Sequence, residues 1–466
     1  MCARRRGRRV TMSVQGVVLA CGGERRFGDL VTQDRPRHML DLGFNPIVWH
    51  ALQTLEHGGV KDVRLVARGD HAASRFEAWL REGYDGGCDV QVVAAADDAD
   101  TADALRAAMP TVNPDAQVLA VISGDLVTDV RLSDVLATHV RGGAVATCLL
   151  AKRRAWNGLD MKVGRPPKGA HYVGLANDRL LLMADEEDVD KVLKLRRPML
   201  GRARDLVVHT DLLDAQLYVL DKARVSALLD AKPRMTSLQL DVIPALVRRQ
   251  FRAQLAGSAG PEQAVQSHVT SETSDDGLME AVFGVANQGA GHGGGTSTPS
   301  PPTTQPCCAH LAPDDAYCAR VDTVVPALLE VSREIASSNP GDASHLNGRK
   351  MSKYENFVDP TVVIGGKSAI GPGCIVGPGT SFGEKCSVKR SVVGAGCHVG
   401  DGVRLVNCVV MNRATIEDGA TVQGSVVGPR AVIGAGASLR ECLVEAEFEV
   451  EEGDDVRSET LQNKSR

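Results

Sequence analysis

The first half of the chain alternates short apolar runs with segments of helical periodicity. Unbroken apolar runs predict buried strands at 16–20, 62–67, 89–95, 116–125 and 144–151. Amphipathic spacing predicts helices between them, at 47–56, 74–81, 101–109 and 132–140. Strands that alternate with helices are typical of a parallel, doubly wound sheet, because each parallel strand needs a crossover connection. We therefore predict a doubly wound α/β domain over residues 13–255.

The last third of the chain carries a six-residue repeat of apolar positions. The repeated residues are all aliphatic or aromatic: Ile364, Ile370, Val376, Phe382, Val388, Val393, Val399, Leu405, Val410, Ile416, Val422, Val427, Ile433, Leu439 and Val444. A hexapeptide repeat is the signature of a β-helix, in which each apolar residue points into a triangular prism and three repeats complete a coil. From Val388 on, the spacing runs five, six, six, so one corner of each coil is shorter.

This register predicts a parallel β-helix over 357–450 and an acidic tail over 451–466. Cys374, Cys386 and Cys397 each follow an inward residue by four positions and fall on three different faces. That placement argues against a metal cluster and favours cysteine as a small buried residue.

The segment between these domains has a different composition. Residues 256–312 are rich in Gly, Ser, Thr and Pro and lack periodicity, so we predict a disordered linker. His292 and the pair Cys307–Cys308 lie in it; a solvated loop is the simpler interpretation, and a metal site the alternative. Residues 313–356 predict a connector with a short helix that Pro326 interrupts. Residues 1–12 are arginine-rich and predict a disordered extension.

Composition narrows the functional classes. The 466 residues include 43% hydrophobic ones, enough for a core, and the net charge of −5 with mixed signs argues against a nucleic-acid binder. No apolar run approaches the ~20 residues that span a bilayer. The twelve cysteines include no CxxC pair, which is typical of reduced thiols in a cytosolic protein. We expect a cytoplasmic protein.

The stretch VVLACGGERRFGDLVTQDRPRHML (17–40) has the layout of a nucleotide-phosphate site. It resembles the opening of sugar-phosphate nucleotidylyltransferases, L-A-x-G-x-G-x-R-L followed by P-K-P-L-L. In that alignment Gly22 is kept, Glu24 replaces a glycine, Arg26 matches the arginine and Arg37 replaces the lysine. A carboxylate at Glu24 opposes a phosphate cradle, which needs close backbone approach and a positive field.

Other elements of that family are only partly present. Asp125 ends the strand AVISGD at the metal-binding position, with Asp129 four residues on, although such an Asp is also a common helix N-cap. The G-T-A-x-A element opens with Asp100 instead of glycine. The second metal aspartate falls on Ser237, with Asp241 four residues late. Two-metal phosphoryl chemistry needs both carboxylates.

We therefore predict a nucleotidyltransferase-like domain without catalysis. The prediction includes no catalytic residue, no metal and no cofactor. The vestigial nucleotide-site positions are Gly22, Glu24, Arg26, Arg37 and Asp125.

Several segments together resemble the gamma subunits of eukaryotic translation initiation factor two-B. They include DTADALR (100–106), SGDLVTDVRL (123–132), HTDLLDAQLYVLDK (209–222) and the hexapeptide run 387–412. The resemblance implies a left-handed β-helix and an accessory subunit of a guanine-nucleotide exchange complex. Its implied partners are the epsilon subunit, the other subunits, and initiation factor two as substrate, without direct contact to nucleic acid or membrane. The family's exchange domain is a helical repeat that ends epsilon, and this chain ends at Arg466, so we expect gamma.

Two alternatives stay open at this point. An active pyrophosphorylase that makes GDP-mannose or ADP-glucose would use Arg26, Arg37 and Asp125 with Mg²⁺. A β-helix acyltransferase would use His398, the one histidine inside the repeats.

Overall fold

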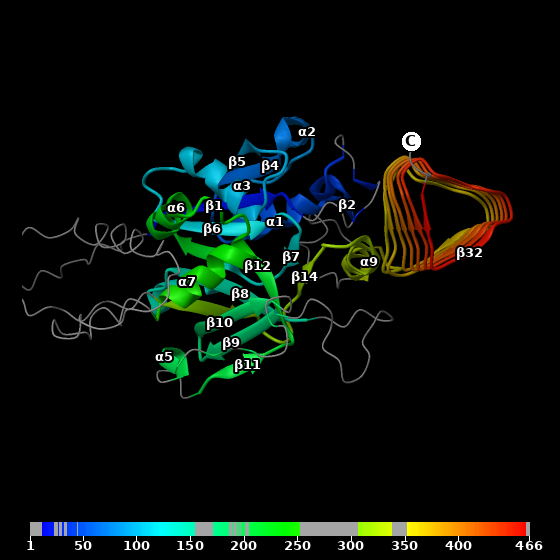
Figure 1. Ribbon diagram of the computed structural model, residues 1–466. Helices are drawn as coiled ribbons and strands as arrows, with labels where there is room; N and C mark the ends of the chain where they lie inside the picture. Colours follow the sequence, from blue (N-terminus) through cyan, green and yellow to red (C-terminus); the bar gives the residue numbers. More distant parts are fainter. Residues whose placement is uncertain are drawn as a thin grey trace, which may run out of the picture.

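A computed structural model describes residues 12–22, 27, 30–31, 35–43, 45–153, 171–185, 189, 193, 195, 197–200, 205–251, 306–337 and 352–462. Figure 1 shows an α/β domain beside a triangular prism of stacked strands. A sheet with helices on both faces forms the first part, and the coils of a β-helix form the second. Glu24, Arg26 and His292 lie outside the described residues.

A ten-stranded sheet, in the order β11-β9-β10-β13-β8-β12-β6-β1-β4-β5, organises the α/β domain. Its parallel part is formed by β1 (Val14–Ala20), β4 (Asp62–Arg68), β5 (Asp89–Ala95) and β6 (Val118–Ser123). With β8 (Ala146–Lys152), these are the five strands predicted from apolar runs. The crossover helices are α1 (Ile47–His57), α2 (Gly69–Glu82), α3 (Thr101–Ala108) and α4 (Leu132–Gly142). Helix α2 begins before the predicted start at Ser74, because its first turn is largely exposed and gives no apolar signal.

The other half of the sheet is mainly antiparallel and was not predicted as strands. Strand β12 (Leu212–Asp221) pairs antiparallel with both β6 and β8. Beyond them lie β9 (His171–Ala176), β10 (Arg179–Asp185) and the edge strand β11 (Val207–His209). Helical segments on this half are α5 (Arg197–Leu200), α6 (Lys222–Ala231), the π-helix η4 (Leu238–Val242) and α7 (Ile243–Arg249). The doubly wound sheet is therefore extended by an antiparallel half.

Strand β13 (Cys307–Leu311) corrects the predicted end of the linker. It lies inside the sheet, parallel to β8 and antiparallel to β10, so residues 307–311 are not part of a disordered segment. Cys307 and Cys308 are buried, which rules out the solvated loop predicted for them. The physical reason is that this short apolar run forms backbone pairs with β8 on one side and with β10 on the other. A composition rule applied over more than fifty residues does not detect such a run.

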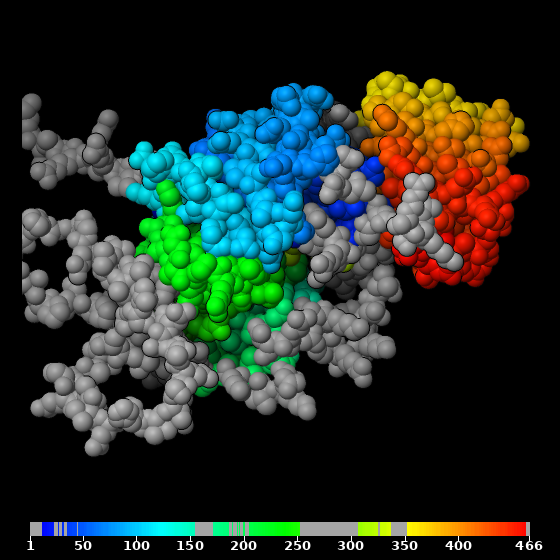
Figure 2. All heavy atoms as spheres, turned by 45° about the horizontal axis from the view of Figure 1, so that its top comes forward, coloured from blue at the N-terminus to red at the C-terminus, as the bar shows by residue number. Residues whose placement is uncertain are grey.

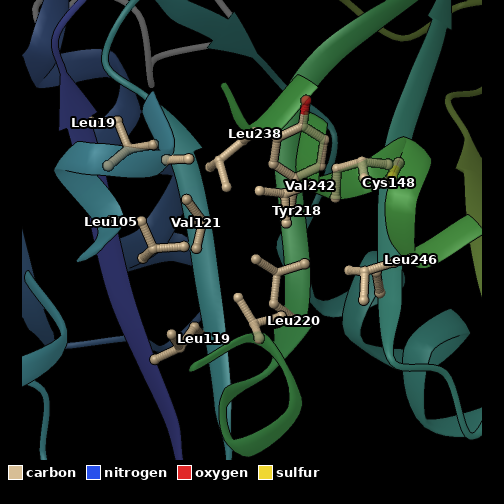
Figure 3. Packing of buried hydrophobic residues seen from close by; sticks show 14 of the residues in the cluster. Leu19, Leu105, Leu119, Val121, Cys148, Tyr218, Leu220, Leu238, Val242 and Leu246 are labelled. Atoms are coloured by element: carbon tan, nitrogen blue, oxygen red, sulfur yellow. The ribbon is translucent and has the colours of Figure 1, made fainter. Parts of the chain in front are cut away.

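Apolar side chains cover both faces of the sheet. Figure 3 shows one face, where Leu105 from α3 packs near Leu119 and Val121, and Leu238, Val242 and Leu246 pack near Tyr218 and Cys148. On the other face α1, α2 and α4 bury a second cluster around Val18, Leu52 and Phe76. This three-layer packing holds the carboxyl ends of β1 and β6 in fixed positions.

The β-helix has three parallel sheets that form the faces of the prism. The first face packs on the α/β domain and is called the docking face. It contains β15 (Phe357–Val358), β18 (Ile375–Val376), β21 (Val392–Val393), β24 (Val409–Val410), β27 (Val426–Val427), β30 (Leu443–Val444) and β33 (Thr460–Leu461). The second face contains β16 (Val363–Ile364), β19 (Ser381–Phe382), β22 (His398–Val399), β25 (Thr415–Ile416), β28 (Val432–Ile433) and β31 (Glu449–Val450). The third face contains β17 (Ala369–Ile370), β20 (Ser387–Lys389), β23 (Arg404–Val406), β26 (Thr421–Gln423), β29 (Ser438–Arg440) and β32 (Asp455–Arg457).

The hexapeptide register is confirmed by the buried core of this prism. Residues predicted to point inward stack on one another, as Val376, Val393 and Val410 do on the docking face. Cys374, Cys386 and Cys397 are buried and precede strands of three different faces, as predicted. The short corner of each coil turns at one left-handed residue: Arg390 has φ of 48° and Asn407 of 56°.

The predicted acidic tail is wrong for residues 451–461. Strands β32 and β33 continue the third and docking faces, so the β-helix extends to Leu461. Val456 and Leu461 carry the inward column past Val450, and their apolar side chains pack on the core. The acidic residues Glu451, Glu452, Asp455 and Glu459 are exposed on the outside of these coils.

An apolar seam joins the two domains. Ile375, Val392, Val409 and Val426 point outward from the docking face and are nearly completely buried. They pack with Leu40 and Leu42 of the α/β domain, and with the π-helix η5 (Val324–Leu328) and α9 (Leu329–Ser337). Figure 1 shows α9 against the prism, and Figure 2 shows the yellow-to-red β-helix beside the α/β domain. Burial of this apolar surface fixes the orientation of the domains.

A polar contact lies within the seam. The Asn412 side-chain amide donates a hydrogen bond to the carboxylate of Asp41 in β2 (Asp41–Leu42), which pairs with β3 (Asn45–Pro46). Burial raises the pKa of Asp41 to about 6, although the Asn412 hydrogen bond and Arg35 act in the opposite direction. The residue keeps some exposed surface, but its carboxylate is enclosed by the seam.

Val426→Asp should separate the domains without unfolding the β-helix core. Its charge would enter the apolar seam at a cost of roughly 3 kcal/mol, whereas the neighbouring inward column is untouched. We expect calorimetry to show two separate unfolding transitions and proteolysis to cut between the domains. Gln423→Asp, exposed on the same coil, is the matched control. An unchanged single transition in Val426→Asp would contradict the seam.

Asp41→Asn should change how stability depends on pH. A carboxyl with a raised folded-state pKa binds protons more tightly when folded, so wild-type stability falls as pH rises from about 4 to about 6. The variant lacks that loss. We expect its advantage in melting temperature to be largest above pH about 6 and to vanish near pH about 4. A constant difference across this range would refute the assignment.

Candidate functional site

The candidate site lies where the sheet reverses its winding direction. Neighbouring strands β1 and β6 continue to opposite sides of the sheet, and ligands of doubly wound folds bind beyond the carboxyl ends of such strands. Gly22 follows β1 with φ of +82°, a conformation that favours glycine. Asp125 follows β6, and Arg37 lies in the 3₁₀ turn η2 (Arg37–Met39). Gly22, Arg37 and Asp125 thus lie at the same edge of the sheet.

Asp125 is completely buried and is held by two arginines. Arg320 donates from Nε to Oδ1 at 3.1 Å and from Nη2 to Oδ2 at 2.8 Å. Arg37 Nη2 lies 3.2 Å from Oδ2, and the Ser123 hydroxyl donates to Oδ1 at 2.6 Å. The bidentate geometry is the strong form of an arginine–carboxylate contact. Both oxygens that a metal ion would need are thus taken by cationic or hydroxyl donors.

The electrostatics of this cluster keep Asp125 ionised. Burial alone would raise the pKa of Asp125, but Arg320 and Arg37 outweigh it and hold that pKa well below its usual range. Burial lowers the pKa of Arg37, partly offset by Asp125. Asp322 adds a further negative charge that acts on both arginines. The cluster is therefore a self-neutralised group of charges, and a divalent cation would have to displace Arg320.

Arg320 reaches Asp125 from a segment that follows the long linker. Strand β14 (Cys318–Arg320) pairs antiparallel with β7 (Leu126–Thr128), directly after Asp125. Sequence reasoning missed Arg320 and Asp322. The run Cys-Ala-Arg-Val-Asp suggests a short strand, with Ala319 and Val321 buried, but no local signal pairs it with a residue 195 positions away.

His38 fills the space beside the carboxyl end of β6. Its Cδ2 lies 2.9 Å from where a Cβ on Gly124 would be, so the ring packs on that backbone. Its Nε2 is 2.9 Å from Arg37 Nη2. Burial and the Arg37 charge lower the pKa of His38 well below its usual value, so the ring is neutral. The imidazole ring therefore reduces the space available to a nucleotide beside the carboxyl end of β6.

Asp100 brings a negative charge next to the loop that follows β1. Its Oδ1 accepts a hydrogen bond from Thr101 N at 2.7 Å and caps α3. The same oxygen lies 3.4 Å from where a Cβ on Gly22 would be. A phosphate that approached this backbone would meet a carboxylate, which opposes binding.

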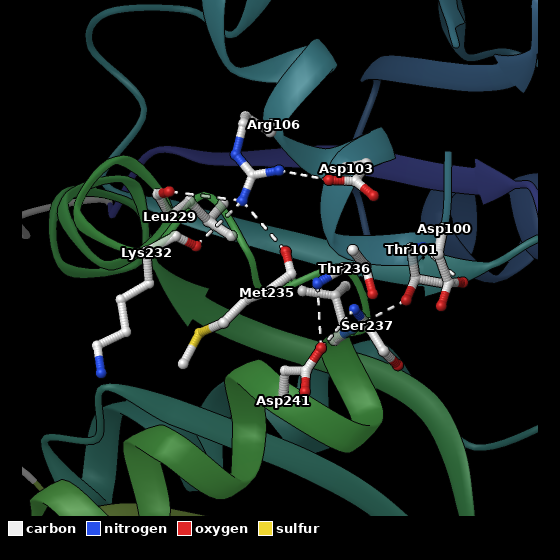
Figure 4. A network of polar contacts seen from close by, with 11 residues as sticks. Asp100, Thr101, Asp103, Arg106, Leu229, Lys232, Met235, Thr236, Ser237 and Asp241 are labelled. Carbon is white, nitrogen blue, oxygen red and sulfur yellow. Dashed lines mark hydrogen bonds and ion pairs between the residues drawn. The ribbon is translucent and has the colours of Figure 1, made fainter. Parts of the chain in front are cut away.

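The rest of the G-T-A-x-A counterpart forms a structural junction, shown in Figure 4. Thr101 Oγ1 accepts from Leu238 N at 2.9 Å, and Arg106 donates to the carbonyls of Leu229, Lys232 and Met235 at 3.2–3.5 Å. Asp241 Oδ2 accepts from the backbone amides of Thr236 and Ser237, both at 3.0 Å. Asp241 is therefore a turn cap and not the second metal carboxylate.

Asp129 and His398 also have structural contacts. Asp129 Oδ1 accepts a hydrogen bond from Tyr317 N at 2.7 Å, so it fixes the β14 segment and does not join Asp125. His398 is exposed on the second face, with Nδ1 2.9 Å from Ser381 Oγ. Across the part of the chain that the structure describes, no three His, Cys, Asp or Glu side chains are placed to hold a metal ion. Over the same ranges, no helix has the length and apolarity to cross a bilayer.

Replacing Arg320 with Ala should lower the free energy of unfolding by ~3–5 kcal/mol, because Asp125 would keep its charge in the interior with one partner fewer. Urea denaturation measures this loss. The double variant Arg320→Ala/Asp125→Ala should cost less than the sum of the single changes. Arg131→Ala, which removes an exposed pair with Asp134, is the control and should cost at most about 1 kcal/mol. Equal costs at Arg320 and Arg131 would contradict this description.

Both domains are similar to known proteins. A nucleotidyl transferase family model matches residues 15–158, and the model of the left-handed β-helix domain of eIF2B subunit epsilon matches residues 353–456. Translation initiation factor eIF2B subunit gamma of Dictyostelium discoideum is 23% identical over 386 residues, which cover 78% of this chain and 83% of the relative. The same subunit of Schizosaccharomyces pombe is 25% identical over 391 residues, which cover 81% and 74%. The predicted resemblance and the predicted fold class are confirmed, and the pyrophosphorylase alternative is not favoured.

Proposed function

We propose that this chain, which resembles eIF2B gamma subunits from the α/β domain through the β-helix, is a non-catalytic subunit of the guanine-nucleotide exchange complex for translation initiation factor two. The proposal that the chain is non-catalytic rests on one observation: Arg320 and Arg37 occupy the carboxylate oxygens of Asp125. Nucleotidyl transfer needs a metal-binding carboxylate and an open phosphate cradle. This chain uses that carboxylate as an internal counter-ion.

The role that remains for such a chain is to hold partners in position. The apolar seam makes the α/β domain and the β-helix one rigid body, and rigid bodies fix the relative geometry of the proteins bound to them. In the exchange complex the chain would orient the epsilon subunit and its substrate, initiation factor two. GDP release would then be promoted by the epsilon subunit, with this chain as its support.

The remaining assignments follow from the same proposal. The chain would work in the cytosol, with epsilon and the other exchange-complex subunits as partners. It would need no cofactor, and contact neither membrane nor nucleic acid directly.

Gentle purification of the tagged full-length chain from its own cells tests the assembly. Mass spectrometry should find a larger subunit with its own β-helix and a helical C-terminal domain, together with initiation factor two. Val426→Asp, which opens the seam, should lower the recovery of these partners, whereas Thr415→Asp, which adds the same charge on the second face of the same coil, should not. Recovery of a homo-oligomer alone would contradict the proposal.

A direct assay tests the loss of catalysis. The purified chain, given Mg²⁺, a nucleoside triphosphate and a sugar 1-phosphate, should form no nucleotide sugar and no pyrophosphate. Turnover in the usual enzyme range of ~1–1000 per second would overturn the proposal. Activity that disappears in Asp125→Asn would identify Asp125 as a working metal ligand.

A further inference from the structure

The third face of the β-helix is directed away from the α/β domain. Figure 1 shows its strand β32 on an outer side of the prism, which is not the side that packs against α9. Most of its strands have three residues, so the face is broader than the others. Stacked parallel strands, about 4.8 Å apart, make it flat and rigid.

Four cations project from this face and its short corner without a partner. Lys389, Arg404 and Arg440 are exposed on the strands, and Arg390 is exposed at the adjoining corner. Among the described residues, none of these side chains has a hydrogen bond or an ion pair. Arg457, one coil beyond Arg440, is paired with Asp455 at 3.2 Å. The unpaired charges are therefore concentrated on the coils before the last one.

The side chains between these cations are uncharged and mostly small. Ser387, Thr421, Gln423 and Ser438 point outward from the same strands, together with the partly buried Val406. None of them is large enough to prevent a second backbone from lying flat on the sheet. The cations therefore flank a smooth strip and do not cover it.

The corner between the second and third faces is acidic beyond its first coils. Exposed Lys367 and Lys385 lie at this corner beside Glu384. The column then continues with Asp401 and Asp418, and each later carboxylate accepts a hydrogen bond from the preceding coil's amide. Glu452 lies at the same position two coils further on. The basic face is thus bounded by negative charge on one side, and only a ligand of limited width avoids repulsion.

We propose that the third face of the β-helix is a binding surface for an acidic, extended segment of a partner protein. Lys389 and Arg440 are three coils apart, about 14 Å, which equals two repeats of side chains on one side of an extended peptide, ~7 Å each. Acidic residues at alternate positions of such a segment would reach both cations and Arg404 between them. The inference adds to the proposed function and does not depend on it.

The observations favour a protein segment over nucleic acid. The chain has a net charge of −5, and the acidic column would repel a long polyanion. The strip between the cations has no aromatic side chain on which a base could stack. A short peptide can follow the strip and avoid the column.

Fluorescence anisotropy on the purified full-length chain tests this surface. The probe is a labelled Glu-Ser repeat peptide of about twelve residues, compared with its Gln-Ser counterpart and with a labelled oligouridine. The test variant is Lys389→Glu/Arg404→Glu/Arg440→Glu. The matched control, Lys61→Glu/Arg81→Glu/Arg234→Glu, makes the same change in net charge at one exposed lysine and two exposed arginines of the α/β domain.

We expect the Glu-Ser peptide to bind in a salt-sensitive manner and the Gln-Ser peptide not to bind. The test variant should weaken binding on the order of tenfold or more, and the control variant less than about twofold. Circular dichroism should show both variants folded, as expected for exposed side chains. Absence of binding, equal losses in the two variants, or tighter binding of oligouridine would each overturn the proposal. Since no partner subunit is present, these outcomes are independent of the co-purification result.

Discussion

A buried ion pair between Asp125 and Arg320 joins parts of the chain that lie 195 positions apart. Its two hydrogen bonds hold β14 against β7, and the same segment continues into η5 and α9 at the seam. A buried charge without its partner costs several kcal/mol, so this contact constrains everything attached to it. The carboxylate at the metal-binding position of nucleotidyltransferases instead anchors the connection between the domains.

This use of Asp125 explains why the site differs from a nucleotide pocket in several places at once. Arg320 occupies its oxygens, His38 packs on the adjacent backbone, and Asp100 places a negative charge beside Gly22. Each feature would be costly in a phosphate site, yet each has a structural partner here. The fold keeps the loop positions of a nucleotidyltransferase, but their side chains stabilise the domain and its junction with the β-helix.

Local periodicity made the β-helix and the parallel strands predictable. Each inward valine of the prism repeats the same environment many times, so spacing alone gave its register. Strand β13 was not predictable because its short apolar run only becomes a strand between β8 and β10. Arg37 and Asp125 were found from their match to family motifs, whereas Arg320 was missed because tertiary folding alone brings it there. The seam was missed for a related reason: Val409 and Val426 each precede an inward residue of the repeat, but which domain covers them depends on the whole fold.

Titration with Mn²⁺, followed by electron paramagnetic resonance of the free ion, tests the central claim most directly. If Asp125 serves as an internal counter-ion, the purified chain should leave Mn²⁺ free at concentrations that fill ordinary enzyme sites, with or without a nucleoside triphosphate. Stoichiometric Mn²⁺ binding that is lost in Asp125→Asn would show that Arg320 yields to a metal, and the account of a closed site would be wrong.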